Sequence, residues 1–243
     1  MTEKRLYIRG EFRMKKTFVF CIPFAGGSVG SYVDIFRGIK NAEVKLIELS
    51  GHGGRYNEGL YDYFFQAVDD IYQYIYENME EDRDYAIFGH SMGALIAYEV
   101  YYKLFENNVK LPKYLFLSGC KAPGLERNER NYKLSDNELI EKIRDMNGTQ
   151  QEILRHPEFR IYFLPIIRAD YKLIENYKHV QKSSKIQVPT IIFYGDKDEI
   201  KEEDIISWSD YTQEKPEFFR FTGGHFFIYD HSQEILEIIS GLL

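Results

Sequence analysis

Short apolar runs rich in β-branched and aromatic residues recur along the chain, with helical patterns between them. The runs cover residues 17–22, 44–49, 85–88, 114–118, 190–194 and 218–221. Both alternating sets of positions in such runs are apolar, which is typical of parallel strands buried on both faces. Because parallel neighbours need a crossover connection, the pattern predicts right-handed βαβ units in an α/β fold: a mostly parallel central sheet with helices on both faces.

The clearest helical pattern lies between the second and third runs. Its apolar positions, spaced as i, i+3, i+4 and i+7, are Tyr61, Phe64, Phe65, Val68, Ile71, Tyr72 and Ile75. This spacing predicts an amphipathic helix with one apolar stripe.

The alternation of strands and helices stops over residues 121–184. These roughly 64 residues carry helical signals with no convincing strand, whereas an ordinary crossover helix needs about a dozen. Ser135 and Glu138 predict a capping box at the start of one helix, and a second helical stretch near residues 159–177 is interrupted or kinked at Pro165. We interpret the block as an all-helical insertion that covers something above the sheet.

Composition and length narrow the class of protein. No internal repeat and no Gly/Ser-rich or Pro-rich linker divides the 243 residues, so we expect one domain over residues 1–243. The 31 Lys and Arg against 38 Asp and Glu give a net charge of −7, which disfavours nucleic acid as a partner. No 18 apolar residues run together, and residues 1–16 lack the apolar core of a signal peptide. We therefore expect a cytoplasmic protein with no membrane partner.

Cys21 and Cys120 belong to runs that we interpret as buried strands, where cysteine behaves as a small hydrophobic residue. Neither a disulfide nor a zinc site is expected. Met14 follows a charged segment and is an alternative to Met1 as the first residue, and the sequence does not decide between them.

The sharpest motif is Gly89-His90-Ser91-Met92-Gly93, between the run 85–88 and the helical pattern 94–102. A serine in this context is typical of a nucleophile elbow, a strained strand-to-helix turn in which a side chain at either glycine would clash. Such a turn places Ser91 Oγ at the carboxyl end of the sheet, where it is the candidate nucleophile.

A serine nucleophile needs a base and an orienting acid, in the chain order serine, acid, histidine. The six histidines are His52, His90, His156, His179, His225 and His231. Only His225 follows a late strand, in a loop with two small neighbours, so it is the predicted general base. We expect His90 to pack, His231 to begin or cap the final helix, and His156 and His179 to be solvated.

The acid is predicted in the segment Gly195-Asp196-Lys197-Asp198, which ends the fifth run. Asp198 is preferred because the loop must leave the sheet before it turns toward His225. Asp196 is the alternative, with capping of the turn as its other possible role.

An oxyanion needs two backbone donors, one from the residue after the nucleophile and one from a loop after an early strand. Met92 supplies the first, and Ala25 in the small-residue loop 23–28 is the predicted second. Gly26, Gly27 and Gly30 form no G-x-G-x-x-G and are followed by no Lys-Ser/Thr pair, so a phosphate site is not favoured.

Six segments taken together resemble one family. They are Pro23 to Ser28 (P-F-A-G-G-S), Ser50 to Arg55 (S-G-H-G-G-R), Gly89 to Gly93 (G-H-S-M-G), Arg168 to Tyr171 (R-A-D-Y), Gly195 to Asp198, and Gly223 to Phe227. In this order they are similar to the type II thioesterases of nonribosomal peptide and polyketide synthesis, members of the α/β-hydrolase superfamily. The chain departs from the family at two positions: Ser50 stands where Pro is usual and Phe24 where many members have His. Neither is expected to touch the catalytic residues.

The resemblance implies an α/β-hydrolase fold with the insertion as a lid and a catalytic triad of Ser91, Asp198 and His225. It implies hydrolysis of acyl thioesters on the phosphopantetheine arm of carrier proteins, by a monomer without a metal or redox cofactor. An acyl-CoA thioesterase or a general carboxylesterase of the same fold is the alternative enzyme. A catalytically silent hydrolase that acts as a binding protein is the alternative of another class.

By the same resemblance the carrier proteins are acidic, so docking on this acidic chain needs locally clustered positive charge. The best cluster lies at the start of the insertion and consists of Lys121, Arg127, Arg130 and Lys133. Glu126 and Glu129 dilute it, and a solvated loop of mixed charge is the alternative interpretation.

Overall fold

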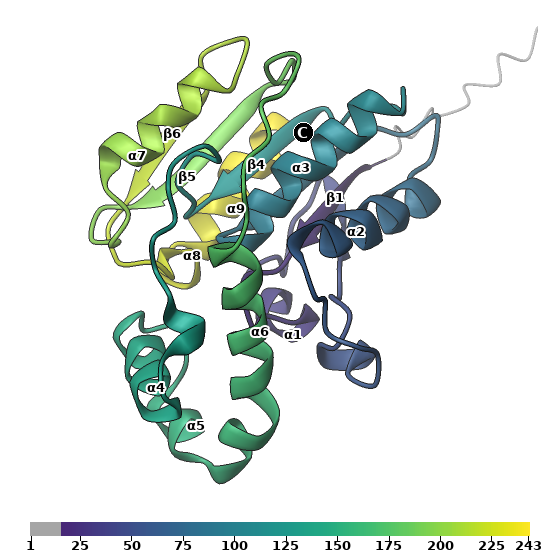
Figure 1. The fold of residues 1–243 in the computed structure, drawn as a ribbon. Coiled ribbons are helices and arrows are strands. Elements are labelled where there is room, and N and C mark those ends of the chain that lie inside the picture. Colours follow the sequence, from purple (N-terminus) through teal and green to yellow (C-terminus); the bar gives the residue numbers. More distant parts are fainter. Residues whose placement is uncertain (1–15) are drawn as a thin grey trace, which may run out of the picture.

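The computed structural model describes residues 16–243, so the expectations for the preceding segment, including the choice between Met1 and Met14, lie outside the described residues. Within the described part, six strands form one parallel sheet in the order β2-β1-β3-β4-β5-β6. The strands are β1 (Thr17–Ile22), β2 (Ala42–Leu46), β3 (Tyr85–His90), β4 (Tyr114–Ser118), β5 (Thr190–Gly195) and β6 (Glu217–Phe221). Helices lie on both sides of the sheet (Figure 1), which confirms the predicted α/β fold.

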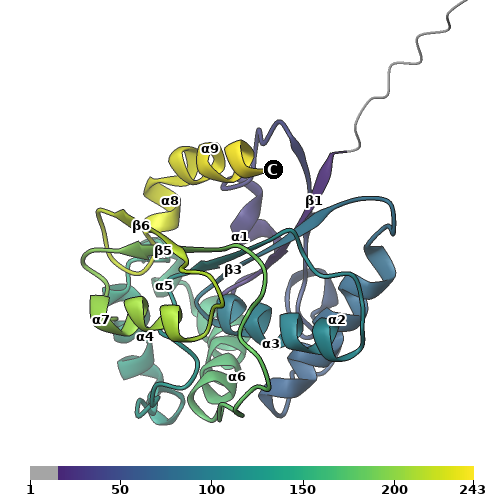
Figure 2. The same cartoon turned by 90° about the horizontal axis from the view of Figure 1, so that it is seen from above.

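Strand residues alternate between the two faces of the sheet, and each face packs against its own helices (Figure 2). Phe20 of β1 belongs to the core on one face, and its neighbours Val19 and Cys21 to the core on the other. The first face is covered by α2 (Phe64–Asn78), α3 (Met92–Glu106) and α7 (Glu202–Ile206), and the second by α1 (Val29–Val33), α8 (Phe227–Asp230) and α9 (Ser232–Leu242). Two 3₁₀ turns, η1 (Gly53–Arg55) and η4 (Ser207–Asp210), complete the connections.

β2 is shorter than the apolar run that predicts it and is shifted toward the N-terminus. Its last pair joins Leu46 to Cys21, one residue before β1 ends at Ile22. Ile47 and Leu49 are buried in the core beyond the strand end. The end of this run is therefore buried beyond the last strand pair, with the Ile47 N–H still donating to the Cys21 carbonyl oxygen at 3.0 Å.

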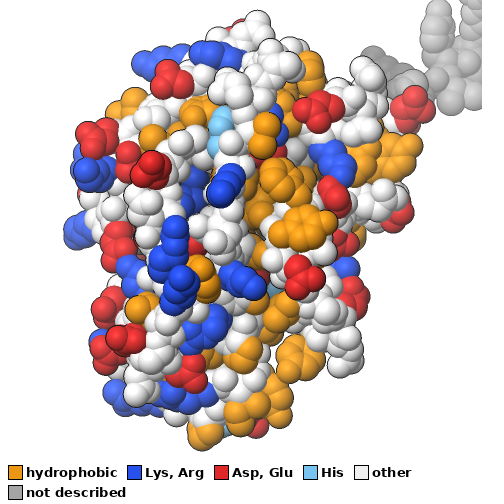
Figure 3. All heavy atoms as spheres, viewed as in Figure 1, with side chains coloured by type: hydrophobic (Ala, Val, Ile, Leu, Met, Phe, Trp, Pro, Cys, Tyr) orange, Lys and Arg blue, Asp and Glu red, His pale blue; other side chains and the backbone are white. Residues whose placement is uncertain are grey.

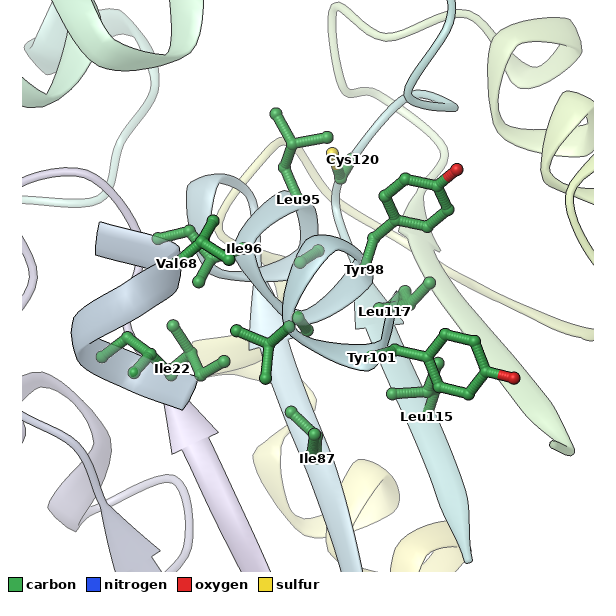
Figure 4. Close-up of a cluster of buried hydrophobic side chains, with 14 of the residues drawn as sticks. Ile22, Val68, Ile87, Leu95, Ile96, Tyr98, Tyr101, Leu115, Leu117 and Cys120 are labelled. Carbon is green, nitrogen blue, oxygen red and sulfur yellow. The ribbon is translucent and has the colours of Figure 1, made fainter. Parts of the chain in front are cut away.

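Helix α3 lies directly on the sheet, as Figure 4 shows. Its Leu95 and Ile96 pack with Ile22 of β1, Ile87 of β3 and Leu115 of β4 in one core cluster. Each fully buried aliphatic side chain of this kind contributes about 2 kcal/mol to the free energy of unfolding. This packing fixes the start of α3 against the end of β3, and so fixes the single residue between them.

The chain between β4 and β5 contains helices and no strand, as the sequence predicts (Figure 1). Its elements are η2 (Asn131–Lys133), α4 (Asp136–Asp145), α5 (Gln151–Arg155), the π-helical turn η3 (Phe159–Phe163) and α6 (Leu164–Glu175). The predicted capping box opens α4, with the Ser135 N–H donating to Glu138 Oε2 at 2.8 Å. Pro165 stands in the first turn of α6, directly after the π-helical turn η3. The predicted interruption is thus a change from π- to α-helix.

The insertion has a small core of its own, formed by residues such as Leu139, Leu154 and Leu164. Where it returns to the sheet it is attached to α3 through Glu99, a buried carboxylate. The Tyr177 hydroxyl donates to Glu99 Oε1 at 2.5 Å, and Lys182 Nζ lies 2.6 Å from Glu99 Oε2. Glu99 therefore joins the end of the insertion to the main body. Among residues 16–243, no helix has the length and apolar character needed to cross a bilayer.

Replacing Glu99 by Ala should lower the free energy of unfolding by about 3 kcal/mol, because the ammonium of Lys182 loses its counter-charge in a largely buried setting. Glu106→Ala, at the exposed end of the same helix, is the matched control and should cost less than about 0.5 kcal/mol. Urea unfolding of both variants measures the difference. Equal stabilities of the two variants would show that the Glu99 contacts do not hold the insertion.

Candidate active site

Ser91 is the single residue between β3 and α3, and its backbone is strained. It has φ 54° and ψ −114°, in the left-handed half of conformational space that residues with a side chain rarely adopt. A Cβ on Gly89 would lie 2.2 Å from the Gly93 carbonyl oxygen, and a Cβ on Gly93 would lie 2.2 Å from the Ile22 carbonyl oxygen. The two glycines are therefore required by the close approach of β1, β3 and α3, as the motif predicts.

His225 follows β6 and lies against Asp198, which follows β5. The His225 Nδ1 atom is 2.8 Å from Asp198 Oδ2, and the two side chains are only 10% and 6% exposed. A carboxylate at this distance takes a hydrogen bond from Nδ1–H, which leaves the Nε2 lone pair free to act as a base. Because β5 and β6 are parallel neighbours, their carboxyl ends bring the two loops together.

Asp196, the alternative acid, has a different partner. Its Oδ1 accepts a hydrogen bond from the Gly223 N–H at 3.0 Å, so it holds the loop that carries His225. The structure thus places Asp198, and not Asp196, against the imidazole.

Ser91, Asp198 and His225 line one cavity of about 410 Å³ at the carboxyl end of the sheet. Residues of the insertion, including Tyr171 and Ile174 of α6, also line this cavity. The Ser91 hydroxyl makes no hydrogen bond to His225 in this structure. Such bonds often form only when substrate is bound.

The two predicted oxyanion donors lie at fixed points of the backbone. Met92 is the first residue of α3, so its N–H has no acceptor within the helix. Ala25 lies in a turn that is closed by a 2.8 Å hydrogen bond from the Gly27 N–H to the Phe24 carbonyl oxygen. Within residues 16–243, the Ala25 N–H has no hydrogen-bond acceptor.

His90 is fully buried and packs, as expected. Its Nδ1 lies 2.9 Å from Ser118 Oγ, and its ring centroid is 5.1 Å from that of His225. Burial, as the largest cause, lowers the pKa of His90 well below its usual value. A neutral imidazole therefore stands behind the candidate base.

Three of the remaining histidines lie near the surface, and one of them makes a contact that the sequence did not predict. His156 is exposed, and His231 stands at the start of α9, as expected. His179, expected to be solvated, is only half-exposed: its Nε2 lies 3.0 Å from the Tyr98 hydroxyl, and its ring packs edge-on against Tyr211. The return of the insertion across α3 creates this contact, which no local pattern reveals.

Sequence reasoning gave His52 no role, although it lies in the S-G-H-G-G-R segment. Its side chain is 1% exposed, with Nε2 2.8 Å from Asp170 Oδ2 of the R-A-D-Y segment on α6. The two motifs were visible in the sequence. Their pairing was not, because 118 positions separate the residues.

The two departures from the family pattern are accommodated by local contacts. The Ser50 N–H donates to the Tyr61 hydroxyl at 3.0 Å, a bond that Pro could not make. The Phe24 ring packs against Phe226 at 4.9 Å between centroids.

Cys21 and Cys120 are buried free thiols, as expected. In the described part of the chain, no group of three or more His, Cys, Asp or Glu side chains is arranged to hold a metal ion.

The predicted basic cluster is split by the fold. Lys121 and Arg127 are half-buried and line the cavity. Arg127 donates to the carbonyl oxygens of Pro123 and Leu125 at 3.1 Å, so its guanidinium holds the segment after β4. Arg130 and Lys133 are exposed. Of the four predicted docking residues, Lys121 and Arg127 therefore line the cavity, whereas Arg130 and Lys133 lie outside it.

Comparisons with known proteins place the whole described chain in one group. A family model for the thioesterase domain matches residues 17–243. The gramicidin S biosynthesis protein GrsT of Aneurinibacillus migulanus is 29% identical over 92% of this chain and 88% of its own length. RedJ, the thioesterase of the prodiginine pathway in Streptomyces coelicolor, superposes with a TM-score of 0.87 at 30% identity, covering 93% of this chain and 90% of RedJ. ClbQ of the colibactin pathway gives a TM-score of 0.87 at 29% identity, covering 94% and 97%.

Ser91→Ala should lower kcat for an aryl ester by about 10,000-fold, because the loss of the nucleophile leaves only binding and the oxyanion donors. The KM should change little. A fluorophosphonate probe followed by peptide mapping should place the adduct on Ser91. An adduct on another serine would contradict the assignment of the elbow.

Asp198→Asn should lower kcat by about 1,000-fold or more, because an amide cannot hold the imidazole in the tautomer with a free Nε2. Asp196→Asn, which changes only the support of the His225 loop, should cost less than about tenfold. Steady-state kinetics of both variants, with circular dichroism to confirm folding, make the comparison. A folded Asp196 variant that is slower than the Asp198 variant would reverse the assignment of the acid.

Proposed function

The chain belongs to the thioesterase family, and from this we propose that it hydrolyses acyl thioesters on the phosphopantetheine arm of carrier proteins in nonribosomal peptide or polyketide synthesis, releasing stalled or misprimed groups. The observation that carries the proposal is the shared cavity: Ser91 and the Asp198–His225 pair meet in one hollow that the helical insertion also lines. The match over nearly the full length of pathway thioesterases supports the choice of substrate.

The proposed reaction has two halves. In the first, His225 Nε2 takes the proton of Ser91 Oγ as that oxygen attacks the thioester carbonyl, and Asp198 stabilises the imidazolium. The N–H groups of Ala25 and Met92 hold the oxyanion, the C–S bond breaks, and His225 returns the proton to the leaving thiolate. In the second, His225 removes a proton from water, the hydroxide attacks the acyl-serine, and the carboxylic acid leaves as Ser91 recovers its proton.

We assign residues 121–184 as a lid within one domain of residues 1–243. The assignment is supported by the position of the insertion between β4 and β5, at the carboxyl end of the sheet where Ser91 stands (Figure 1). It is also supported by the cavity, which residues of α6 line together with the candidate nucleophile. A cavity of about 410 Å³ lies within the range of small-molecule sites.

The docking surface for an acidic carrier is proposed around Arg130 and Lys133, which are exposed beside the entrance to the lid. Lys and Arg side chains gather on the same face, over the segment that leads from β4 into the insertion (Figure 3). Positive charge at a rim steers an acidic partner and adds little for a neutral small substrate.

When both substrates carry the same acyl group, kcat/KM should be higher for the carrier-linked thioester than for the CoA-linked thioester. The double variant Arg130→Glu/Lys133→Glu should raise the KM for the carrier-linked substrate about tenfold at low salt. The effect should shrink as salt is added, because exposed charges are screened. Hydrolysis of a small soluble thioester should not change.

The matched control is Lys40→Glu/Lys215→Glu. Both lysines are exposed and precede β2 and β6, at the opposite end of the sheet from Ser91. Carrier KM values that respond equally to both double variants, or to neither, would show that docking lies elsewhere. A preference for the CoA thioester would contradict the proposed substrate.

A further inference from the structure

Asp170 joins the lid to the loop that precedes α1. It lies on α6 with a side chain that is 1% exposed, and its Oδ2 accepts a hydrogen bond from the Gly26 N–H at 2.7 Å. The same oxygen is 2.8 Å from His52 Nε2. One buried carboxylate oxygen thus connects α6, the turn after β1 and the segment after β2.

The contacts of His52 define its protonation. Its Nδ1 lies 2.9 Å from the Ser50 carbonyl oxygen, and its Nε2 faces Asp170. Both partners are acceptors, so both ring nitrogens must donate and the imidazole is an imidazolium opposite a carboxylate. Burial opposes this charge, but the hydrogen bond and charge of Asp170, with smaller contributions from Ser50 and Glu48, raise the pKa of His52.

The turn at Gly26 is held by α6 in a second way. Gly26 has φ +73°, and a Cβ at this position would lie 2.4 Å from Ile167 Cγ1. Ile167 precedes Asp170 by about one helical turn, so both project from the same side of α6. α6 therefore packs directly on Gly26 and also accepts its N–H.

These contacts fix the backbone on both sides of Ala25. The Gly27 N–H to Phe24 carbonyl bond closes a four-residue turn, and a left-handed glycine at its third position is the type II arrangement. Type I differs by a flip of the peptide between Ala25 and Gly26, which would direct the Ala25 carbonyl oxygen toward the Asp170 carboxylate. The negative charge of Asp170 favours the type II turn, in which the Gly26 N–H faces the carboxylate. It opposes the type I turn, in which the Ala25 carbonyl oxygen would face it.

We propose that Asp170 is a positioning residue for the oxyanion site, and that His52 holds its carboxylate in place. The inference rests on the proposed function, in which the Ala25 N–H binds the oxyanion. Because the acceptor for Gly26 comes from the lid, the oxyanion site is complete only when α6 is seated against the turn. The hydrogen bond thereby couples closure of the lid to the chemical step.

Asp170→Ala should lower kcat for a soluble aryl ester about 50-fold with KM unchanged within twofold, since a displaced oxyanion donor weakens binding of the transition state and not of the substrate. The Ki of an aryl boronic acid, which forms a tetrahedral adduct with the serine, should rise by the same factor. Asp136→Asn is the control: it removes a 2.6 Å ion pair between α4 and Arg168 of α6, both within the lid, without touching the turn. Its kinetics should stay within twofold of the wild type.

The isosteric Asp170→Asn separates the positioning role from a loss of folding. Without the carboxylate, His52 loses the charge that raises its pKa, so the imidazolium that supports the turn deprotonates at lower pH. The activity contributed by the charged pair is present at low pH and is lost as the pH rises through the pKa of His52. The alkaline limb of kcat should therefore move to lower pH in Asp170→Asn, and the boronate Ki should follow it.

Three results would overturn the inference. The first is an unchanged kcat in both Asp170 variants. The second is a raised KM with unchanged kcat and unchanged boronate Ki, which would make Asp170 a residue of substrate binding. Either result with an active wild type would leave the proposed function standing. A wild-type protein that turns over neither esters nor thioesters would overturn the proposed function and this inference with it.

Discussion

The strained backbone of Ser91 is the constraint on which the rest of the site depends. A non-glycine residue in the left-handed region costs on the order of 1–3 kcal/mol, and it persists only where the surroundings over-determine it. Here β3 on one side and α3 on the other are both packed into the core, and Gly89 and Gly93 allow their backbones to meet. This strained turn places the Ser91 hydroxyl at the carboxyl end of the sheet. The packing that stabilises the fold therefore also exposes the candidate nucleophile to the cavity.

The parallel sheet then brings the other groups to the serine. All six strands of the described chain point the same way, so the loops after β1, β3, β5 and β6 open at one edge. These loops carry Ala25, Ser91, Asp198 and His225 respectively. The insertion follows β4, between the strands that hold the nucleophile and the acid, so it lies over their common edge (Figure 1). Buried Asp170 and Glu99 attach it at two separate points, to the turn at Gly26 and to α3.

Local pattern was sufficient for the strands, the elbow, the capping box at Ser135 and the insertion, because each is determined by neighbours in sequence. It failed where distant segments meet. β2 pairs with β1 only from Ala42 to Leu46, and His179 contacts Tyr98, which lies 81 positions away. Arg127 turns inward because carbonyl groups of its own loop face it. The pairing of His52 with Asp170 depends in the same way on how α6 packs, although both motifs could be found by eye.

The central claim is that Ser91 attacks a carbonyl whose oxygen lies between the Ala25 and Met92 N–H groups beneath the lid. A crystal structure of the enzyme inactivated by an alkyl phosphonate, a stable mimic of the tetrahedral intermediate, tests it most directly. We expect the phosphorus on Ser91 Oγ and the phosphoryl oxygen about 3 Å from both nitrogens, the distance of a hydrogen bond. A phosphoryl oxygen turned toward solvent, or phosphorus on another residue, would contradict the account.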